Sequence, residues 1–232
     1  MLFSIGVLIV ASPLLAAATA AIYFYDWHSP FYLATRVGRG GRTFRMAKFR
    51  SMIVNADKVG GSSTSATDRR ITPVGAFVRR YKLDELPQFW NVLLGHMSVV
   101  GPRPNVPDGV AVYTAVERHL LDLRPGVTDL ASIVFADEGE ILRGHADADL
   151  AYDQLIRPWK SRLGLLYVEH ASTSLAVRIV WLTFVALLSR RRALAGVVDI
   201  LQRLRAPEDL IRVARRDQTL VPALPPGVEL AR

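Results

Sequence analysis

The sequence predicts an α/β domain that is mostly α-helical, with one small β-hairpin, behind an apolar N-terminal membrane segment. Three observations predict this fold class. The chain opens with an uncharged stretch, two short alternating stretches flank a glycine-rich turn, and most later apolar residues recur at helical spacing. The 232 residues are enough for one domain of ordinary core size plus appendages.

The opening apolar segment, residues 2–25, contains no charged side chain. At about 1.5 Å per helical residue it is long enough to cross a hydrocarbon core of roughly 30 Å. A cleaved signal peptide fits poorly, because no Lys or Arg precedes the stretch. By the positive-inside rule, the arginines that follow it predict that the rest of the chain is cytoplasmic. They are Arg36, Arg39, Arg42 and Arg45.

The pair Ser12 and Pro13 stands in the middle of this segment. Proline removes one helical hydrogen bond and kinks a helix, and a serine hydroxyl can satisfy the freed carbonyl. Two topologies are therefore open. One is a kinked helix that spans the membrane, which these physical arguments favour. The other is a re-entrant helix that enters and leaves by the cytoplasmic face.

The predicted hairpin consists of strands over residues 31–37 and 43–49, joined by residues 38–41, which read Gly-Arg-Gly-Gly. Thr72 is predicted to cap a helix that begins at Pro73.

A second helix is expected over residues 84–95, and its apolar spacing predicts one buried face. The residues of that face are Leu83, Leu86, Trp90, Leu93 and Leu94. Further helices are expected over residues 110–123, 152–169 and 175–188, the middle one interrupted at Pro158. The last is too short to span a membrane, which predicts a core or interfacial helix.

Two adjacent carboxylates, Asp84 and Glu85, form the candidate catalytic pair. Neighbouring helical residues diverge by about 100°, so these side chains cannot flank one bond as glycosidase carboxylates do. One can face a substrate while the other contacts a metal, a cation or water. Asp84 lies near a helix N-terminus, where the helix dipole favours its ionised form. Taken alone, Asp84 is more simply interpreted as a helix cap.

Candidate phosphate-binding cations accompany this pair. Lys48 and Arg50 share one face of the second strand, although they could equally be solvated charges on an edge strand. Arg103 lies between Pro102 and Pro104. The prolines stiffen the backbone, so the guanidinium loses less entropy when it binds a diphosphate. The simpler alternative for this segment is a surface turn.

Other functional classes find little support in the sequence. It contains no phosphate-binding GxxxxGK[ST] motif and no HExxH motif, and its five histidines do not follow a metal-ligand spacing. The net charge of +8 favours anionic partners, but the cations are dispersed without a nucleic-acid-binding pattern. The absence of cysteine excludes disulfides, thiol catalysis and zinc–thiolate sites.

Several ordered blocks of the sequence resemble the bacterial sugar transferases, the monotopic phosphoglycosyl transferases that start glycan assembly on polyprenol phosphate. The resemblance covers roughly residues 3–188 and fits the short form of the family. The blocks are Arg36-Val37-Gly38, Lys48-Phe49-Arg50-Ser51-Met52, Leu83-Asp84-Glu85-Leu86-Pro87-Gln88, Asn91-Val92-Leu93, Met97-Ser98-Val99-Val100-Gly101-Pro102-Arg103-Pro104 and Arg124-Pro125-Gly126-Val127-Thr128. Together these ordered blocks are highly specific, although no single block would be.

The resemblance implies a chemistry and a location. Asp84 would attack the β-phosphate of a UDP-sugar, UMP would leave, and polyprenol phosphate, usually undecaprenyl phosphate, would then take the phosphosugar. Glu85 is implied as the partner of Asp84, and Mg²⁺ as a cofactor with Asp84 as its ligand. The protein would be monotopic, on the cytoplasmic face of the bacterial inner membrane.

The resemblance also implies roles for the residues around this pair. Lys48, Arg50 and Arg79 fall at active-site cation positions. The block Pro102-Arg103-Pro104 corresponds to a clamp on the nucleotide phosphates. Ser12-Pro13 corresponds to the break of a re-entrant helix, which reverses the preference from physical arguments alone.

Three parts of the chain are therefore expected: a re-entrant membrane helix over residues 1–28, a cytoplasmic catalytic domain with interfacial helices over 29–192, and a C-terminal appendage over 193–232. The expected partners are a UDP-sugar, polyprenol phosphate and the cytoplasmic leaflet, without nucleic acid, and a homodimer is left open. Two rival functions stay open: an inactive sugar-transferase fold acting as a membrane scaffold, and a basic membrane-tethered nucleic-acid binder.

Overall fold

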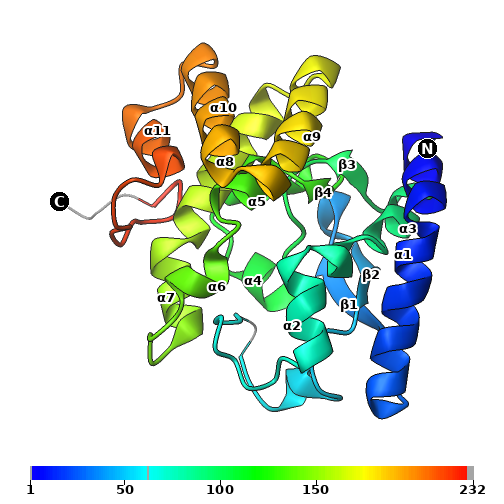
Figure 1. Ribbon diagram of the computed structural model, residues 1–232. Helices are drawn as coiled ribbons and strands as arrows, with labels where there is room; N and C mark the ends of the chain where they lie inside the picture. Colours follow the sequence, from blue (N-terminus) through cyan, green and yellow to red (C-terminus); the bar gives the residue numbers. More distant parts are fainter. Residues whose placement is uncertain (1, 62, 229–232) are drawn as a thin grey trace.

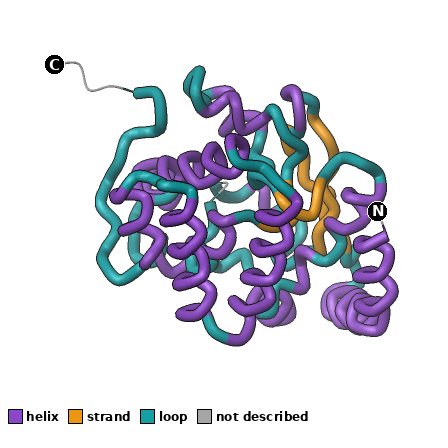
Figure 2. Tube along the Cα trace, turned by 90° about the horizontal axis from the view of Figure 1, so that it is seen from above, coloured by secondary structure: helices purple, strands orange, loops and turns teal. Residues whose placement is uncertain are grey.

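The computed structural model describes residues 2–61 and 63–228. Within them the fold is mostly helical and contains two separate two-stranded sheets. The long N-terminal helix runs along one side of the molecule, and the C-terminal helices lie on the opposite side (Figure 1). The strands gather on the side where the N-terminus lies, and helices fill the rest (Figure 2).

Helix α1 (Leu2–Asp26) continues through Pro13. Pro13 has no N–H to donate to the carbonyl of Ile9, one turn earlier, and the Ser12 hydroxyl donates to that carbonyl instead at 2.7 Å. The helix is long and apolar enough to cross a membrane, by length and composition. Near its start, the Phe3 ring lies 6.3 Å from the Phe89 ring of the domain.

The later part of α1 also packs on the domain. Ala18 and Ile22 share a small buried cluster with Phe49 and Val78. Contacts near both ends therefore lay α1 along the domain.

The predicted hairpin is confirmed with its bounds. Strand β1 (Phe31–Val37) pairs antiparallel with β2 (Thr43–Phe49), so that Val37 faces Thr43 across the turn. The turn contains the short 3₁₀ segment η1 (Arg39–Gly41). Gly40 and Gly41 have φ values of +66° and +78°, a region that favours glycine.

A second, parallel pair joins β3 (Ser98–Val100) to β4 (Gly126–Thr128). Neither strand of this pair is among those predicted from the sequence. The residue after β3, Gly101, lies very close to the first residue of β4, Gly126. A Cβ on Gly126 would lie 2.1 Å from the Gly101 nitrogen. Only glycine fits there, and the close approach fixes the chain that leads into Pro102-Arg103-Pro104.

Helices and short 3₁₀ segments surround the two sheets. The remaining elements are η2 (Ala56–Lys58), α2 (Pro73–Arg80), η3 (Leu83–Glu85), α3 (Gln88–Leu93), α4 (Pro107–Ala111), η4 (Glu117–Leu121), α5 (Leu130–Val134), α6 (Glu138–Ile141), α7 (Ala148–Leu155), α8 (Arg157–Glu169), α9 (Thr173–Leu188), α10 (Arg190–Arg203) and α11 (Glu208–Arg215). The predicted cap is confirmed, because the Thr72 hydroxyl accepts a hydrogen bond from the Gly75 N–H at 2.9 Å. The break at Pro158 and the helix near residues 175–188 are also present.

The helix expected over residues 110–123 is wrong, because the chain breaks between α4 and η4. The Thr114 hydroxyl accepts a hydrogen bond from the Glu117 N–H, and the Glu117 carboxylate accepts one from the Thr114 N–H, both at 3.0 Å. This reciprocal pair is a capping box, which starts a new helical segment. The T-x-x-E spacing that signals it is present in the sequence.

The face expected to be buried on the second helix is also wrong. In α3, Trp90 and the following Leu94 are 58% and 55% exposed. The opposite face is buried instead, and it carries Asp84, Gln88 and Asn91. Both ends of the Asn91 amide bond the outer edge of β2, to the Ala47 N–H and the Arg45 carbonyl at 2.8 Å each. The helix therefore turns Gln88 and Asn91 inward, while Trp90 and Leu94 face outward.

The expected C-terminal appendage needs correction. Its boundary at residue 193 falls inside α10, and α10 packs against α9 (Figure 1). Side chains of α10 and α11 belong to the largest buried cluster, together with residues of α5, α8 and α9. Asp137 pairs with Arg190 at 2.6 Å and with Arg216 at 3.1 Å, which ties both ends of this helical pair to the domain. Through residue 228 the segment is therefore part of the main fold.

Candidate active site

Asp84 is the second residue of η3, a segment that begins after Lys82, whose φ of +56° turns the chain sharply after α2. Its side chain is buried, and its Oδ1 atom has no hydrogen-bond partner among the described residues. Burial, and then the charge of Glu85, raise the pKa of Asp84 above its usual range, against the opposing charges of Lys48, Arg79 and Lys82. The pair therefore offers one buried carboxylate oxygen that has no partner.

Glu85 points to a different partner. One Glu85 oxygen accepts a hydrogen bond from Arg103 Nη2 at 2.8 Å. Burial acts to raise the pKa of Glu85, but the charges of Arg103, Lys48 and Lys82 outweigh it and hold the pKa at about 2. As the 100° divergence predicts, the two adjacent carboxylates have separate environments.

Arg103 is held on several sides. Besides Glu85, its guanidinium donates to the Val127 carbonyl and to Gln88 Oε1, the latter at 3.4 Å. The backbone before it is fixed by β4, since the Pro102 carbonyl accepts from the Gly126 N–H at 3.1 Å. Pro104 follows on the other side and restricts the backbone of Arg103 itself. The parallel strand pair thus places the predicted clamp beside the dyad.

The structure brings Lys48 and Arg79 to the same place. Burial lowers the pKa of Lys48, while Glu85 and Asp84 raise it, which requires that the ammonium lie near both carboxylates. The charge of Arg79, from the last turn of α2, acts on Asp84. Lys48 makes no ion pair within 4.0 Å among the described residues, so its charge is available to an anion.

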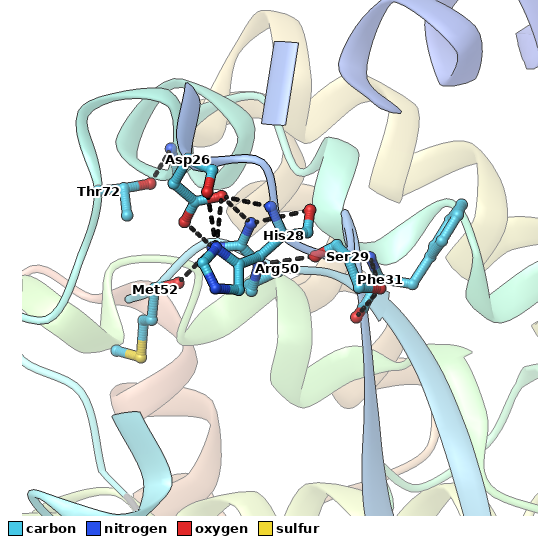
Figure 3. A network of polar contacts seen from close by, with 8 residues as sticks. Asp26, His28, Ser29, Phe31, Arg50, Met52 and Thr72 are labelled. Atoms are coloured by element: carbon cyan, nitrogen blue, oxygen red, sulfur yellow. Dashed lines mark hydrogen bonds and ion pairs between the residues drawn. The ribbon is translucent and has the colours of Figure 1, made fainter. Parts of the chain in front are cut away.

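Arg50 is not brought into this cluster. Strand β2 ends at Phe49. The guanidinium of Arg50 instead donates two hydrogen bonds of 2.6 Å to the carboxylate of Asp26 at the end of α1 (Figure 3). It also donates to the Ser29 carbonyl at 2.7 Å. Ser12 and Pro13 lie on α1, and the Ser12 hydroxyl bonds the helix backbone at the Ile9 carbonyl.

Three residues near the dyad were not predicted as site residues. Arg36 of β1 has its pKa lowered by burial and by the charge of Arg103, so another cation lies beside the clamp. Asp129 caps α5 by accepting from the Ser132 N–H at 2.6 Å, and its pKa is raised by burial. Gln88 is fully buried against Arg103. Arg36 and Gln88 both fall inside the sequence blocks quoted above, which is the signal that could have found them.

The carboxylates at this site could ligate a metal ion in one arrangement. Among the described residues, no three His, Asp or Glu side chains gather into a metal cage. Mg²⁺ often binds through one or two carboxylates together with water and substrate phosphates. The unpartnered oxygen of Asp84 fits that arrangement, whereas one oxygen of Glu85 already accepts a hydrogen bond from Arg103.

Comparisons with known proteins agree on a family. The family model described as "Bacterial sugar transferase" matches residues 1–190. The exopolysaccharide production protein ExoY of Sinorhizobium fredii (strain NBRC 101917 / NGR234) is 39% identical over 147 residues, covering 57% of this chain and 65% of its own length. The UDP-glucose:undecaprenyl-phosphate glucose-1-phosphate transferase of Xanthomonas campestris pv. campestris is 36% identical over 188 residues, covering 78% of this chain and 36% of its own length.

A third relative is the UDP-N-acetylgalactosamine-undecaprenyl-phosphate N-acetylgalactosaminephosphotransferase of Aeromonas hydrophila, 36% identical over 155 residues, which cover 64% of this chain and 36% of that protein. The matches thus span from 36% to 65% of the length of these three relatives. The family match covers the hairpin, the dyad and the Arg103 clamp in one stretch. The chain therefore belongs to the bacterial sugar transferase family.

Proposed function

We propose that this protein transfers a sugar 1-phosphate from a UDP-sugar to polyprenol phosphate, with undecaprenyl phosphate as the expected acceptor. The names of two relatives describe such a transfer to undecaprenyl phosphate. The observation that carries the proposal is the buried Asp84 oxygen, which has no partner among the described residues and lies within the field of Lys48 and Arg79. A carboxylate so placed can attack a phosphorus atom whose charge the cations offset.

The proposed reaction has two displacements. An Asp84 oxygen attacks the phosphorus that bears the sugar and forms a new P–O bond, while the bond to the bridging oxygen breaks and UMP leaves with that oxygen. An oxygen of polyprenol phosphate then attacks the same phosphorus. The bond to Asp84 breaks, the carboxylate is restored, and a polyprenol diphosphosugar is released. Arg103, Lys48 and Arg79 would hold the phosphates, and Glu85 would keep Arg103 in place.

Mg²⁺ is proposed as the cofactor, with Asp84 as its protein ligand and substrate phosphates completing the set. When bound, the ion would offset phosphate charge next to the dyad. We expect excess chelator to abolish activity and added Mg²⁺ to restore it. Full turnover in excess chelator would contradict this part of the proposal.

The proposed location is the cytoplasmic face of the bacterial inner membrane, with α1 entering and leaving by one face. Contacts of α1 with the domain near both of its ends support this topology, because a spanning helix would leave the domain. Exposed apolar side chains beside α1 support contact with the bilayer; they are Phe77, Tyr81, Trp90 and Leu94.

The test is UMP release from a panel of UDP-sugars with undecaprenyl phosphate, followed by a search for a phosphosugar adduct on the peptide that contains Asp84. We expect ping-pong kinetics, and we expect Asp84→Asn to lose at least about 100-fold in rate. Asp122→Asn is the matched control, because it makes the same substitution at an exposed site. A sequential mechanism without an adduct would defeat the proposal.

A further inference from the structure

Gln88 is a buried amide with one unused end. Its side chain is 0% exposed, and its Nε2 atom has no hydrogen-bond partner among the described residues. A buried donor without a partner is costly, and most buried polar groups in native proteins are hydrogen-bonded. Such a donor is suited to an acceptor that arrives with a ligand.

The chemistry of Arg103 fixes which end of the amide is free. A guanidinium carries only donors, so the amide end that faces Arg103 must be the oxygen, and Gln88 Oε1 lies 3.4 Å from Arg103 Nη1. Exchanging the two ends would set the NH₂ group against another donor. The unpartnered end is therefore a donor, and it points away from Arg103.

The free donor shares a helix face with the proposed nucleophile. The residues that join η3 to α3, Leu86 and Pro87, keep right-handed helical dihedrals. Asp84 and Gln88 are thus one turn apart on a common buried face. Along that face lie an acceptor without a partner, Asp84 Oδ1, and a donor without a partner, Gln88 Nε2.

We propose that the Gln88 amide donates a hydrogen bond to a non-bridging oxygen of the phosphoryl group as that group passes to and from Asp84. The inference rests on the proposed function and adds a neutral donor to the cations of the site. A donor fixed in place before the reaction stabilises charge that builds up in the transition state. No bond to Gln88 forms or breaks.

Asn91 shows that an unused amide is not a general property of this helix. It lies one turn further along the same buried face, and both of its ends are bonded to β2. Two buried amides on one face therefore differ in function: Asn91 joins the helix to the hairpin, and Gln88 keeps its donor free beside the dyad.

Two substitutions separate a donor role from a merely structural one. Gln88→Glu keeps an acceptor for Arg103 and strengthens that contact with charge, but it removes the donor. Gln88→Met has similar length and removes both. If Gln88 only positions Arg103, Gln88→Glu should retain activity at a pH high enough to ionise Asp84 despite the added charge, while Gln88→Met loses it. If Gln88 contacts the phosphoryl group, both should lose about 100-fold in kcat, a typical effect of one such donor, with little change in KM for the UDP-sugar.

The rate constant of UMP release is measured in a single turnover. The final amount of Asp84 adduct counts the active molecules, so the rate refers to the chemical step in folded protein alone. A fall in that rate for Gln88→Glu supports the inference. A Gln88→Glu rate within about twofold of the wild type overturns it, since that is below ~0.5 kcal/mol in barrier. Absence of UMP release and adduct in the wild type would instead defeat the proposed function, so the two failures are distinguishable.

Discussion

Asp84 and Glu85 are neighbours in the chain with opposite electrostatic surroundings. Arg103 holds Glu85 ionised, with a pKa of about 2, while burial and the charge of Glu85 raise the pKa of Asp84. Paired carboxylates whose pKa values are pushed apart are suited to different roles in one reaction. Here the permanently charged member fixes the clamp, and the other retains an unpaired oxygen for attack.

This division predicts how activity depends on pH. Attack requires ionised Asp84, so its raised pKa moves the acid limb of the kcat/KM profile to higher pH than an ordinary aspartate would give. Glu85→Gln removes a charge that raises this pKa, so the limb should move to lower pH. Lys48→Met removes a charge that lowers it, so the limb should move to higher pH.

The measurement is the pH profile of UMP release for the wild type and both variants. Opposite shifts are expected even if both variants are slower, because the pH of the acid limb does not depend on the maximal value of kcat/KM. Shifts in the same direction would show that another group controls the acid limb. Asp122→Asn, at an exposed site, should leave the limb where it is.

At this scale the sequence predicts the dyad, Lys48, Arg79 and Arg103 as one group, and the structure brings them together. The family resemblance is what predicts that group, since it implies active-site roles for Lys48, Arg79 and Arg103 around the dyad. The position of the Arg50 side chain could not be predicted in the same way. Strand alternation placed it beside Lys48, but the strand ends before it, and its partner Asp26 is 24 residues earlier in the chain.

Helix α1 is joined to the hairpin at its C-terminal end by the Asp26–Arg50 pair and the backbone of His28 and Ser29 (Figure 3). The Arg50 side chain is only 10% exposed, and it contacts both carboxylate oxygens of Asp26. Two-pronged contacts of this kind are stronger than ordinary surface pairs. The pair therefore fixes how the C-terminal end of α1 is attached to the hairpin.

We expect Arg50→Lys and Asp26→Asn each to destabilise the protein by about 1.5–3 kcal/mol, the range for hydrogen bonds to charged groups. The double variant should lose little more than either single one. Thermal unfolding in detergent micelles checks this. The control is Asp199→Asn, which breaks exposed pairs with Arg178 and Arg203 and should change stability little.

The same variants decide the role of Arg50 in catalysis. A helix anchor predicts that KM for the UDP-sugar stays within about threefold in Arg50→Lys, a change below ~0.7 kcal/mol. A large rise in KM at unchanged stability would return Arg50 to the phosphate-binding group implied by the family resemblance.

Elements with local signals were predictable and those with non-local signals were not. The hairpin and the Thr72 cap depend on adjacent residues, and their bounds agree with the structure. In α3 the spacing of apolar residues correctly predicts a helix, but it predicts the wrong face to be buried. Periodicity does not say which face is inside, and here the inside holds the polar chemistry and Asn91. The partner of β3 is 26 or more residues away, beyond any local pattern.

The largest buried cluster joins the family domain to the C-terminal helices. From residue 193 onward its members are Ala193, Leu194, Val197, Ile200, Leu201, Ala206, Leu210, Ile211 and Ala214. The sequence suggested an appendage because this stretch is rich in charge and then in proline. Its buried residues recur on one face of each helix, and their partners belong to α5, α8 and α9.

This packing predicts that the C-terminal helices are required for folding. Ile200→Ala should cost about 2–5 kcal/mol, as for other fully buried large side chains. Val221→Ala, at an exposed position of the same segment, should cost almost nothing. Thermal unfolding of both variants is the measurement. Equal stability of the two would mean that the segment is an appendage after all.

The topology of α1 can be tested without removing native thiols, since the chain has no cysteine. Leu2 is 86% exposed, so Leu2→Cys offers a reactive position at the start of the helix. A re-entrant helix predicts protection from a membrane-impermeant maleimide in intact cells and labelling after lysis. Labelling in intact cells would show that α1 spans the membrane. Arg192→Cys, on the exposed start of α10, reports the face of the catalytic domain in the same assay.

The contacts of Asn91 have a consequence for crowding. A sheet of two strands has two outer edges, and open edges invite strands from other molecules to pair with them. At Arg45 and Ala47 the outer edge of β2 is already occupied by the Asn91 amide, which takes one donor and one acceptor. Enzyme molecules concentrated on one membrane surface can then lie next to each other without extending the sheet there, so a single amide limits polymerisation from that edge.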